Sequence, residues 1–329
     1  MMIGQDTLLV TLVRLVDRVP APPAPPKRGR GRPVTYPDRL FLKALVIMIV
    51  RHLHSPHELL AVVAQPTAEM RVLRGLLTLP NGRFPARRTW ERRLAALPAA
   101  LPAQIACLGQ HLVALLRPWV ACGRAVAIDS TVLRAKGGVW HKKDREAGVV
   151  PHTSIDREAH WTKSGWHGWV YGWKLHLVVT VAAVWIPLAA RLTPANEADN
   201  EVAPRLLAAL PAEARFVLGD RHYNTDEVRA VCQASARTLV ASRYGRYPHT
   251  DAGAEARRVF HKLRSAAIEN FNGQFKAIFD VHGAVPTKGL VASQRFALGA
   301  VFVYQLTLCC RHEHDLELRV GLDPFLKAA

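Results

Sequence analysis

Cysteine is scarce in this sequence of 329 residues, and its distribution argues against a disulfide-stapled domain. The five cysteines are Cys107, Cys122, Cys232, Cys309 and Cys310, an odd number with no CxxC spacing. Small secreted domains usually carry an even number of cysteines at disulfide-like spacings. The sequence is therefore expected to belong to a reduced, cytoplasmic protein.

Long apolar runs are also lacking. The most apolar stretch covers residues 40–50, and it contains Lys43. A helix needs about 20 apolar residues to span a membrane, so this stretch is too short. The first 19 residues have neither a basic leading region nor a cleavage site, and we expect no signal peptide.

Acidic residues are few: 26 Asp and Glu stand against 44 Lys and Arg, a formal charge of +18 with a pI near 10.3. Residues 1–120 are the more basic part, with 17 Lys and Arg against 6 Asp and Glu. This balance indicates a polyanionic partner, with nucleic acid the first choice and an anionic membrane surface the second. Half of the residues are apolar, which is enough to bury a large core.

The front of the chain divides into a predicted N-terminal helix at 1–19, a linker at 20–34 and a helical domain at 35–120. The linker, PAPPAPPKRGRGRP, is rich in proline and excludes both helix and sheet. Its arginines, Arg28, Arg30 and Arg32, resemble the short hooks that lie in AT-rich minor grooves. A solvated linker that contacts phosphates without specificity is the alternative.

Helical signals follow the linker at 38–53, 55–64, 85–98 and 101–119. Ser55, Pro56 and Glu58 form a capping-box pattern at the start of the second of these helices. The third carries Arg87, Arg88, Arg92 and Arg93. Short helices with one arginine-rich member are typical of a helix-turn-helix DNA-binding domain, while a basic helix face in solvent explains the arginines equally well.

From residue 124 onward the pattern changes to alternating strands and helices. We expect strands at 125–132, 171–182, 184–194, 215–220 and 237–243, and helices at 201–211, 225–236 and about 257–279. Residues 245–255 are expected to form a surface loop. The predicted order is β, β, β, α, β, α, β, α.

Two of the predicted strands lead into an aspartate, Asp129 and Asp220. Neighbouring strands of an open α/β sheet bring such residues together at one edge, where two carboxylates repel unless a cation holds them. The predicted late helix presents Glu269 on a polar stripe between Lys262 and Lys276, opposite an apolar stripe that includes Val259 and Leu263. That polar stripe can equally be a solvated surface.

Three carboxylates in this arrangement suit a pair of Mg²⁺ or Mn²⁺ ions, which prefer oxygen ligands and catalyse phosphodiester transfer. Nearby lysines would then bind phosphates. The strand and helix order, with one acid on the first strand, one on the fourth and one on a late helix, resembles the ribonuclease H-like fold.

Five motifs carry a closer resemblance, to the DDE transposases of bacterial insertion sequences. They are IDST around Asp129, GWKLHL at 172–177, LTPANEADN at 192–200, LGDRHYN around Asp220, and IENFNGQFK, in which Lys276 follows Glu269 by seven residues. Each motif alone is weak, but together and in order they are specific. The resemblance covers residues 124–310, within a predicted catalytic domain at 121–315 that precedes a C-terminal tail at 316–329.

The resemblance implies that Asp129, Asp220 and Glu269 bind the catalytic metals and that Lys276 contacts DNA. It also implies an α/β catalytic domain, with a mixed sheet flanked by helices, behind a small all-helical DNA-binding domain. One departure concerns the tyrosine and arginine that the family often places seven and four residues before the glutamate. Here Lys262 and Ser265 occupy those positions, and Arg264 lies one residue away, about 140° around the helix from Glu269. The role of Arg264 therefore stays open, although we expect it and Lys262 to contact DNA.

An insertion at 136–170 is rich in basic residues, tryptophan and histidine. It can stack on flipped bases or grip transposon ends, or its tryptophans can simply pack on the domain. A zinc site built from its histidines is disfavoured, because it lacks cysteines and ligand spacing. Those histidines are His141, His152, His160 and His167.

The sequence thus predicts a transposase that binds terminal inverted repeats as a homodimer, cleaves there and joins the 3′ ends to target DNA. Two alternatives stay open. A structure-selective nuclease has the same fold without strand joining, and a decayed DNA-binding protein has no cleavage at all.

Overall fold

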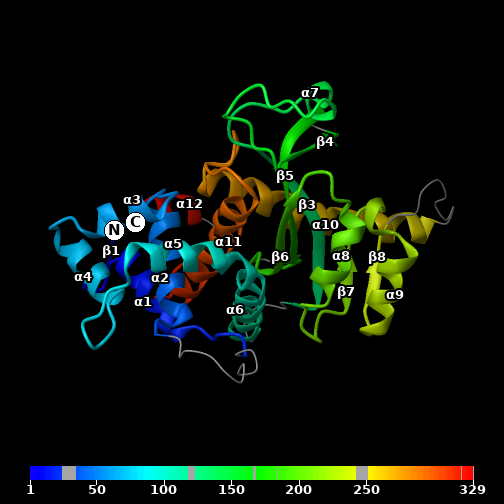
Figure 1. Cartoon of the computed structure of the whole chain (residues 1–329). Coiled ribbons are helices and arrows are strands. Elements are labelled where there is room, and N and C mark those ends of the chain that lie inside the picture. The colour runs from blue at the N-terminus through cyan, green and yellow to red at the C-terminus, as the bar shows by residue number, and fades with distance from the viewer. Residues whose placement is uncertain are drawn as a thin grey trace, which may run out of the picture.

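A computed structural model of the chain shows a mixed β-sheet in its second half (Figure 1). The structure describes residues 1–23, 35–117, 123–165, 168–182, 184–241, 251–319 and 321–328, with the backbone alone at 251–257. Among these residues the sheet has six strands: β3 (Ala125–Arg134), β4 (His160–Ser164), β5 (Gly168–Thr180), β6 (Pro187–Pro194), β7 (Phe216–Leu218) and β8 (Thr238–Val240). The predicted linker, with Arg28, Arg30 and Arg32, lies outside the described residues.

The sheet combines antiparallel and parallel pairing. β5 pairs antiparallel with β3, β4 and β6, whereas β7 pairs parallel with both β3 and β8. The strand order is β4-β5-β3-β7-β8, with β6 also on β5. The parallel strands are connected through helices, as crossover connections require. This is the mixed sheet predicted from the sequence. The predicted β, β, β, α, β, α, β, α order is incomplete, because the helix at Lys142–Glu146 and the strand β4 stand between the first two predicted strands.

β3 extends two residues beyond the predicted strand at 125–132, to Arg134, because it stays paired with β5 along that length. Asp129 therefore lies in the middle of the strand and not at its end. The parallel pairing of β3 with β7, by contrast, stops at Ala127. Asp129 therefore lies just beyond the point where the β3–β7 pair opens. The open edge of β3 is what makes room for a cleft at this end of the sheet.

Helices cover the sheet on both faces. α8 (Asp199–Leu207) contacts β3, β5 and β6, and α10 (Asp251–Ile278) contacts β3, β5 and β7. α9 (Asp226–Ala234) connects β7 to β8, after the short 3-10 helix η2 (Arg221–Tyr223). α10 begins at Asp251 rather than near 257, so part of the predicted surface loop is helix, and residues 245–250 lie outside the described residues.

The front of the chain forms a helical region beside the sheet (Figure 1). It contains a short hairpin of β1 (Met2–Ile3) and β2 (Asp6–Thr7), then α1 (Leu8–Arg18), α2 (Asp38–Val50), α3 (Pro56–Val63), α4 (Ala68–Leu76), α5 (Arg87–Ala96), η1 (Leu97–Ala99) and α6 (Leu101–Leu116). Ser55 caps α3 as predicted: its Oγ accepts a hydrogen bond from the Glu58 amide, and the Glu58 carboxylate accepts one from the His54 amide.

A buried helix, α11 (Leu290–Glu313), joins the helical region to the sheet, since it packs on α1, α2, α6 and β6. Gln305 on α11 donates hydrogen bonds to the carbonyls of Ile105 and Pro187, which belong to α6 and β6. Gly109 lets α6 approach β6 closely, because a Cβ there would lie 2.4 Å from the Pro187 oxygen. The chain ends with α12 (Leu322–Lys327).

A lobe at residues 136–164, containing α7 (Lys142–Glu146) and β4, extends above the sheet (Figure 1). Its loop anchors it to α11: Asp156 accepts a hydrogen bond from the Gly289 amide, and Glu158 accepts one from the Leu290 amide. Two tryptophans of the predicted insertion pack on the lobe, because the indole NH groups of Trp140 and Trp161 both donate to lobe carbonyls. Trp169 is 65% exposed, so the simpler interpretation holds for only part of the insertion.

No single helix among the described residues is long and apolar enough to cross a membrane. Two consecutive helical segments, Arg87–Ala99 and Leu101–Leu116, are together long and apolar enough to cross a membrane, but only by length and composition. The two segments meet at an angle of 62°.

Candidate active site

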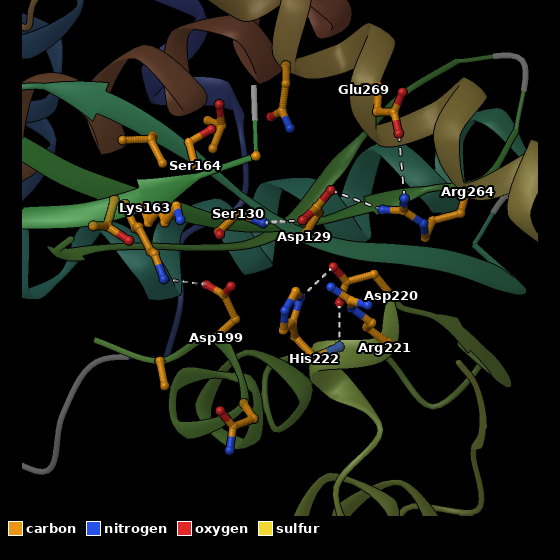
Figure 2. Close-up of a pocket in the computed structure, with 18 of the residues that line it drawn as sticks. Asp129, Ser130, Lys163, Ser164, Asp199, Asp220, Arg221, His222, Arg264 and Glu269 are labelled. Carbon is orange, nitrogen blue, oxygen red and sulfur yellow. Dashed lines mark hydrogen bonds and ion pairs between the residues drawn. The ribbon is translucent and has the colours of Figure 1, made fainter. Parts of the chain in front are cut away.

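A cleft of about 870 Å³ opens at the edge of the sheet where β3 and β7 separate. Its walls come from β3, from the tip of the β4–β5 hairpin, from η2, and from the facing helices α8 and α10. All three acids predicted from the sequence, Asp129, Asp220 and Glu269, line this one cleft (Figure 2). Their convergence follows from the topology, since 140 residues separate the first from the last.

Asp129 is held from two sides. Its Oδ1 accepts a hydrogen bond from the Ser130 amide at 2.8 Å, and its Oδ2 accepts one from the Arg264 guanidinium at 3.0 Å. Burial nevertheless raises the pKa of Asp129 to about 6, against the opposing effect of Arg264, and the charges of Asp220 and Asp199 add to the rise. Desolvation of the carboxylate thus outweighs its single counter-ion.

Arg264 lies between two of the predicted acids. Its Nη1 donates to Asp129, and its Nη2 lies 3.5 Å from Oε1 of Glu269 (Figure 2). The side chain is buried, whereas that of Glu269 is 60% exposed. The sequence leaves the role of Arg264 open because of its angular offset from Glu269. A long arginine side chain spans that offset, and Arg264 contacts the acids directly.

Asp220 follows β7 by two residues and caps η2. Its Oδ1 accepts a hydrogen bond from the His222 amide at 2.8 Å, and its Oδ2 lies 2.9 Å from Nδ1 of His222. These contacts fix the direction of the carboxylate at the mouth of the cleft. His222 was not predicted as a site residue, although it stands in the quoted LGDRHYN motif.

The two predicted lysines of α10 differ in position. Lys276 lines the cleft, partly buried, and desolvation lowers its pKa. The ammonium group of Lys276 has no hydrogen bond or ion pair within the described part of the chain. Lys262 is exposed and does not line the cleft. The apolar stripe predicted on α10 is wrong at its start, since Val259 and Leu263 are 45% and 43% exposed.

The opposite wall carries Asp199, which sequence reasoning missed, beside Lys174 and His176, whose alternation on the predicted strand suits either the metal edge or a solvent-exposed face. Asp199, the first residue of α8, has its Oδ1 3.4 Å from Nζ of Lys174 and 3.4 Å from Nδ1 of His176. Lys174 and His176 therefore face α8 rather than solvent. The signal was present, because Asp199 belongs to the LTPANEADN motif and Lys174 and His176 to the GWKLHL motif.

The residues of the cleft suit a hydrated divalent cation, although they are not assembled around one. Among the described residues, no three His, Cys, Asp or Glu side chains lie close enough together to hold a metal ion. Arg264 and His222 occupy the carboxylates instead. The donors are nevertheless oxygens, and two of them, Oδ1 of Asp199 and Oδ1 of Asn272, are buried without a hydrogen-bond partner. Oxygen acceptors without partners fit Mg²⁺ or Mn²⁺ with its coordinated water.

A family model described as "Transposase DDE domain" matches residues 121–306, more than half of the chain and nearly all of the sheet and its helices. This chain belongs to the transposase DDE domain family. The fold class and the family predicted from the sequence are thereby confirmed. As a DDE transposase, the protein is an enzyme that acts on DNA.

Other comparisons add little. No curated protein matches the transposase. A solved structure described as "Crystal structure of a pre-cleavage Mos1 transpososome" aligns over 86% of this chain and 81% of that chain, at 11% identity. Its TM-score is 0.22.

The four arginines predicted on α5 of the transposase fall into two pairs. Arg87 and Arg93 are tied to acidic residues, Glu91 and Asp38. Arg88 and Arg92, one helical turn apart, are exposed. Neither of these two has an ion pair in the described ranges, so their guanidinium groups are available to a polyanion.

Proposed function

We propose that this transposase binds the ends of its own mobile element, cleaves the DNA there and joins the freed 3′ ends to target DNA. The observation that carries this proposal is the convergence of Asp129, Asp220 and Glu269 in one cleft, with Lys276 on the same helix as Glu269. Cleavage by water and joining by a 3′-hydroxyl are both in-line phosphoryl transfers, so one site can serve both.

In this proposal Asp129, Asp220 and Glu269 hold divalent cations, two Mg²⁺ or Mn²⁺ ions. Such ions activate the attacking oxygen and stabilise the leaving oxygen of a phosphodiester. The protein itself orients the ligands: the Ser130 amide fixes Asp129, and His222 fixes Asp220. Arg264 offsets the negative charge of the acids before the ions and DNA arrive.

DNA contacts are proposed for two regions. Beside the acids, Lys276 and Arg264 bind backbone phosphates, because both are cations within the cleft, and Lys262 extends this contact along α10. In the helical region, Arg88 and Arg92 make the main phosphate contacts, while Arg87 and Arg93 contribute less because they are already paired. An element has two ends, so we propose that the transposase acts as a homodimer on DNA.

Cleavage of end DNA tests the catalytic proposal. The full-length chain is incubated with Mg²⁺ and duplexes carrying the DNA that flanks the coding region. We expect strand cleavage that Asp129→Asn, Asp220→Asn and Glu269→Gln each abolish without loss of DNA binding. Asp226→Asn is the matched control, since Asp226 is an exposed acid in the first turn of α9, outside the cleft. Cleavage by an acid variant at the wild-type rate contradicts the assignment.

The same reactions separate the alternatives. Joined products indicate a transposase that completes strand transfer. Cleavage without joining favours a structure-selective nuclease, and DNA binding without any cleavage favours a decayed copy.

The salt dependence of DNA binding tests the role of α5. Each phosphate contact adds roughly one unit to the slope of log K against log salt concentration. We expect the double change Arg88→Ala and Arg92→Ala to lower that slope by about two, and Arg87→Ala to change it by much less. An unchanged slope in the double variant would show that α5 does not contact DNA.

A further inference from the structure

The wall formed by β5 and α8 contains polar atoms that lack partners. Nine buried side-chain nitrogen or oxygen atoms have no hydrogen-bond partner among the described residues. Two of them, Oδ1 of Asp199 and Nδ1 of His176, belong to this wall, and a third, Oη of Tyr223, belongs to η2, which packs on α8. Buried polar groups without partners are rare in native proteins, and each costs about 1–3 kcal/mol. Three in one place indicate an occupant that supplies the missing hydrogen bonds.

His176 acts as an acceptor toward Asp199. Its imidazole is fully buried, and its Nε2 lies 2.9 Å from Oγ1 of Thr193. With the Thr193 hydroxyl donating to the Pro194 carbonyl at 3.1 Å, we assign the hydrogen of the neutral ring to Nε2, which then donates to Thr193. Burial lowers the pKa of His176 to about 4, which leaves the ring neutral at pH 7. The bare Nδ1 lone pair therefore faces the Asp199 carboxylate.

Oδ1 of Asp199 and Nδ1 of His176 are two acceptors that face one another, so they need a donor between them. Lys174 is the nearest cation, but it is too far from Asp199 for a good hydrogen bond. Its Nζ lies 3.4 Å from Oδ1 of Asp199, beyond the usual length of a charge-assisted hydrogen bond. The same ammonium donates to the Glu197 carbonyl at 3.0 Å. Oδ1 of Asp199 and Nδ1 of His176 both remain without a hydrogen bond.

Tyr223 is the last residue of η2, which packs on α8. Its ring is 1% exposed, and its hydroxyl has no hydrogen-bond partner among the described residues. Burial raises the pKa of Tyr223 well above its usual value, and the nearby charges of Asp199, Asp129 and Asp220 raise it further. The phenol is thus a buried, protonated donor close to these acids.

We propose that Asp199, His176 and Tyr223 bind the coordinated water of the divalent cation, which makes Asp199 a fourth acidic residue of the active site. A hydrated cation supplies what this wall lacks. Its water molecules are strong donors for Asp199 and His176, and their oxygens accept from Tyr223. Figure 2 shows the Asp199 carboxylate on the side of the cleft where Asp129 and Asp220 also lie. The inference rests on the proposed function, because it presupposes a cation at the predicted acids.

Direct binding of Mn²⁺ tests this inference without a catalytic readout. The metal-free, full-length chain is titrated with Mn²⁺, and the free ion is followed by its electron paramagnetic resonance signal. Loss of a residue that supports a metal site weakens binding about 10-fold to 100-fold. We expect Asp199→Asn to raise the Kd by at least about tenfold. Glu201→Gln is the matched control, an exposed acid in the same first turn of α8 and outside the cleft, and it should leave the Kd unchanged.

Tyr223→Phe separates a role in cation binding from a role in folding, because it removes a single oxygen. The hydroxyl has no partner, so its loss should leave the Tm of the metal-free chain equal or higher. The rise in Tm that saturating Mn²⁺ produces should fall, and the Kd should increase about threefold. A purely structural wall gives the opposite result, namely a lower metal-free Tm and an unchanged Kd.

Asp129→Asn shows which proposal fails, if one does. Should Asp129→Asn lose Mn²⁺ binding while Asp199→Asn and Tyr223→Phe bind like the wild type, the inference about the α8 wall is overturned and the catalytic proposal stands. Should the wild type bind no Mn²⁺, or should Asp129→Asn bind it normally, the cation site itself is wrong and both proposals fall.

Discussion

The wall formed by α10 and the wall formed by β5 and α8 face the same cleft, yet they hold their charges differently. On α10, Glu269 is largely exposed and Lys276 has no partner among the described residues. On the other wall, Asp199 and Lys174 are mostly buried and compensate one another. The α10 wall thus keeps charges available for DNA, whereas the α8 wall keeps a fixed polar surface. One site thus combines exposed charges that can contact a ligand with buried, paired charges that hold their positions.

Arg264 is the exception on α10, since it is buried and bound to both Asp129 and Glu269. We expect Arg264→Gln to have the largest effect, a fall in cleavage of about 100-fold, because charge stabilisation at an active site is worth that much. The free energy of unfolding should fall by about 1–3 kcal/mol, because Asp129 loses the cation that offsets its burial. Cleavage assays and chemical denaturation measure the two effects.

The pH dependence of the lost unfolding free energy shows whether Asp129 causes the loss. The pKa of Asp129 is already raised to about 6, and removal of Arg264 raises it further. A raised carboxyl pKa gives stability that is present at low pH and lost as the pH rises through the folded value. The difference between wild type and Arg264→Gln should therefore be small near pH 4 and grow toward pH 7. A difference that does not change with pH contradicts this explanation.

His176 should have the next largest effect on the free energy of unfolding. Its pH dependence has the opposite sign to that of Asp129, because stability is lost as the pH falls. Its folded pKa of about 4 lies below the usual 6.5, so between these values the unfolded chain takes up the proton first. Acidification from pH 6.5 to 4 then lowers the free energy of unfolding, by up to about 3 kcal/mol. His176→Gln keeps a donor for Thr193 and should flatten this slope when denaturation curves are compared with the wild type. An unchanged slope would mean that His176 is protonated in the fold.

The sequence predicted the α10 wall better than the α8 wall for physical reasons. Helical periodicity is local, so the polar stripe with Glu269 and Lys276 is visible in the sequence alone. The same periodicity cannot show where a helix extends beyond the sheet. Val259 and Leu263 are therefore exposed, although the pattern predicts that they pack on the core. Nor does it include side-chain length, through which Arg264 reaches Asp129.

The alternation of Lys174 and His176 on β5 is equally visible, but what covers them is not. Their partner, Asp199, arrives on a helix that follows the next strand, and only the packing of α8 on the sheet shows which face it covers. α4 and α11 are not among the predicted helices either. α11 is buried around its whole circumference, so it lacks the one-sided apolar stripe on which helix prediction depends.

Of the three lysines that line the cleft, Lys174 and Lys276 give the smallest and most direct comparison of the walls. Lys276 is partly buried without a partner, so Lys276→Met removes a desolvated charge and should raise the free energy of unfolding by about 0.5–1 kcal/mol. Lys174→Met removes the cation beside Asp199 and the donor to the Glu197 carbonyl, and it should lower the free energy of unfolding by about 1–2 kcal/mol. Chemical denaturation of the metal-free, DNA-free chain measures both changes. The DNA affinities should run the other way, with Lys276→Met the weaker binder, because the Lys174 ammonium is held by Asp199 and the Glu197 carbonyl, whereas that of Lys276 has no partner among the described residues. If both variants are destabilised and both bind DNA normally, the walls do not differ as described, and Lys276 is a structural residue like Lys174.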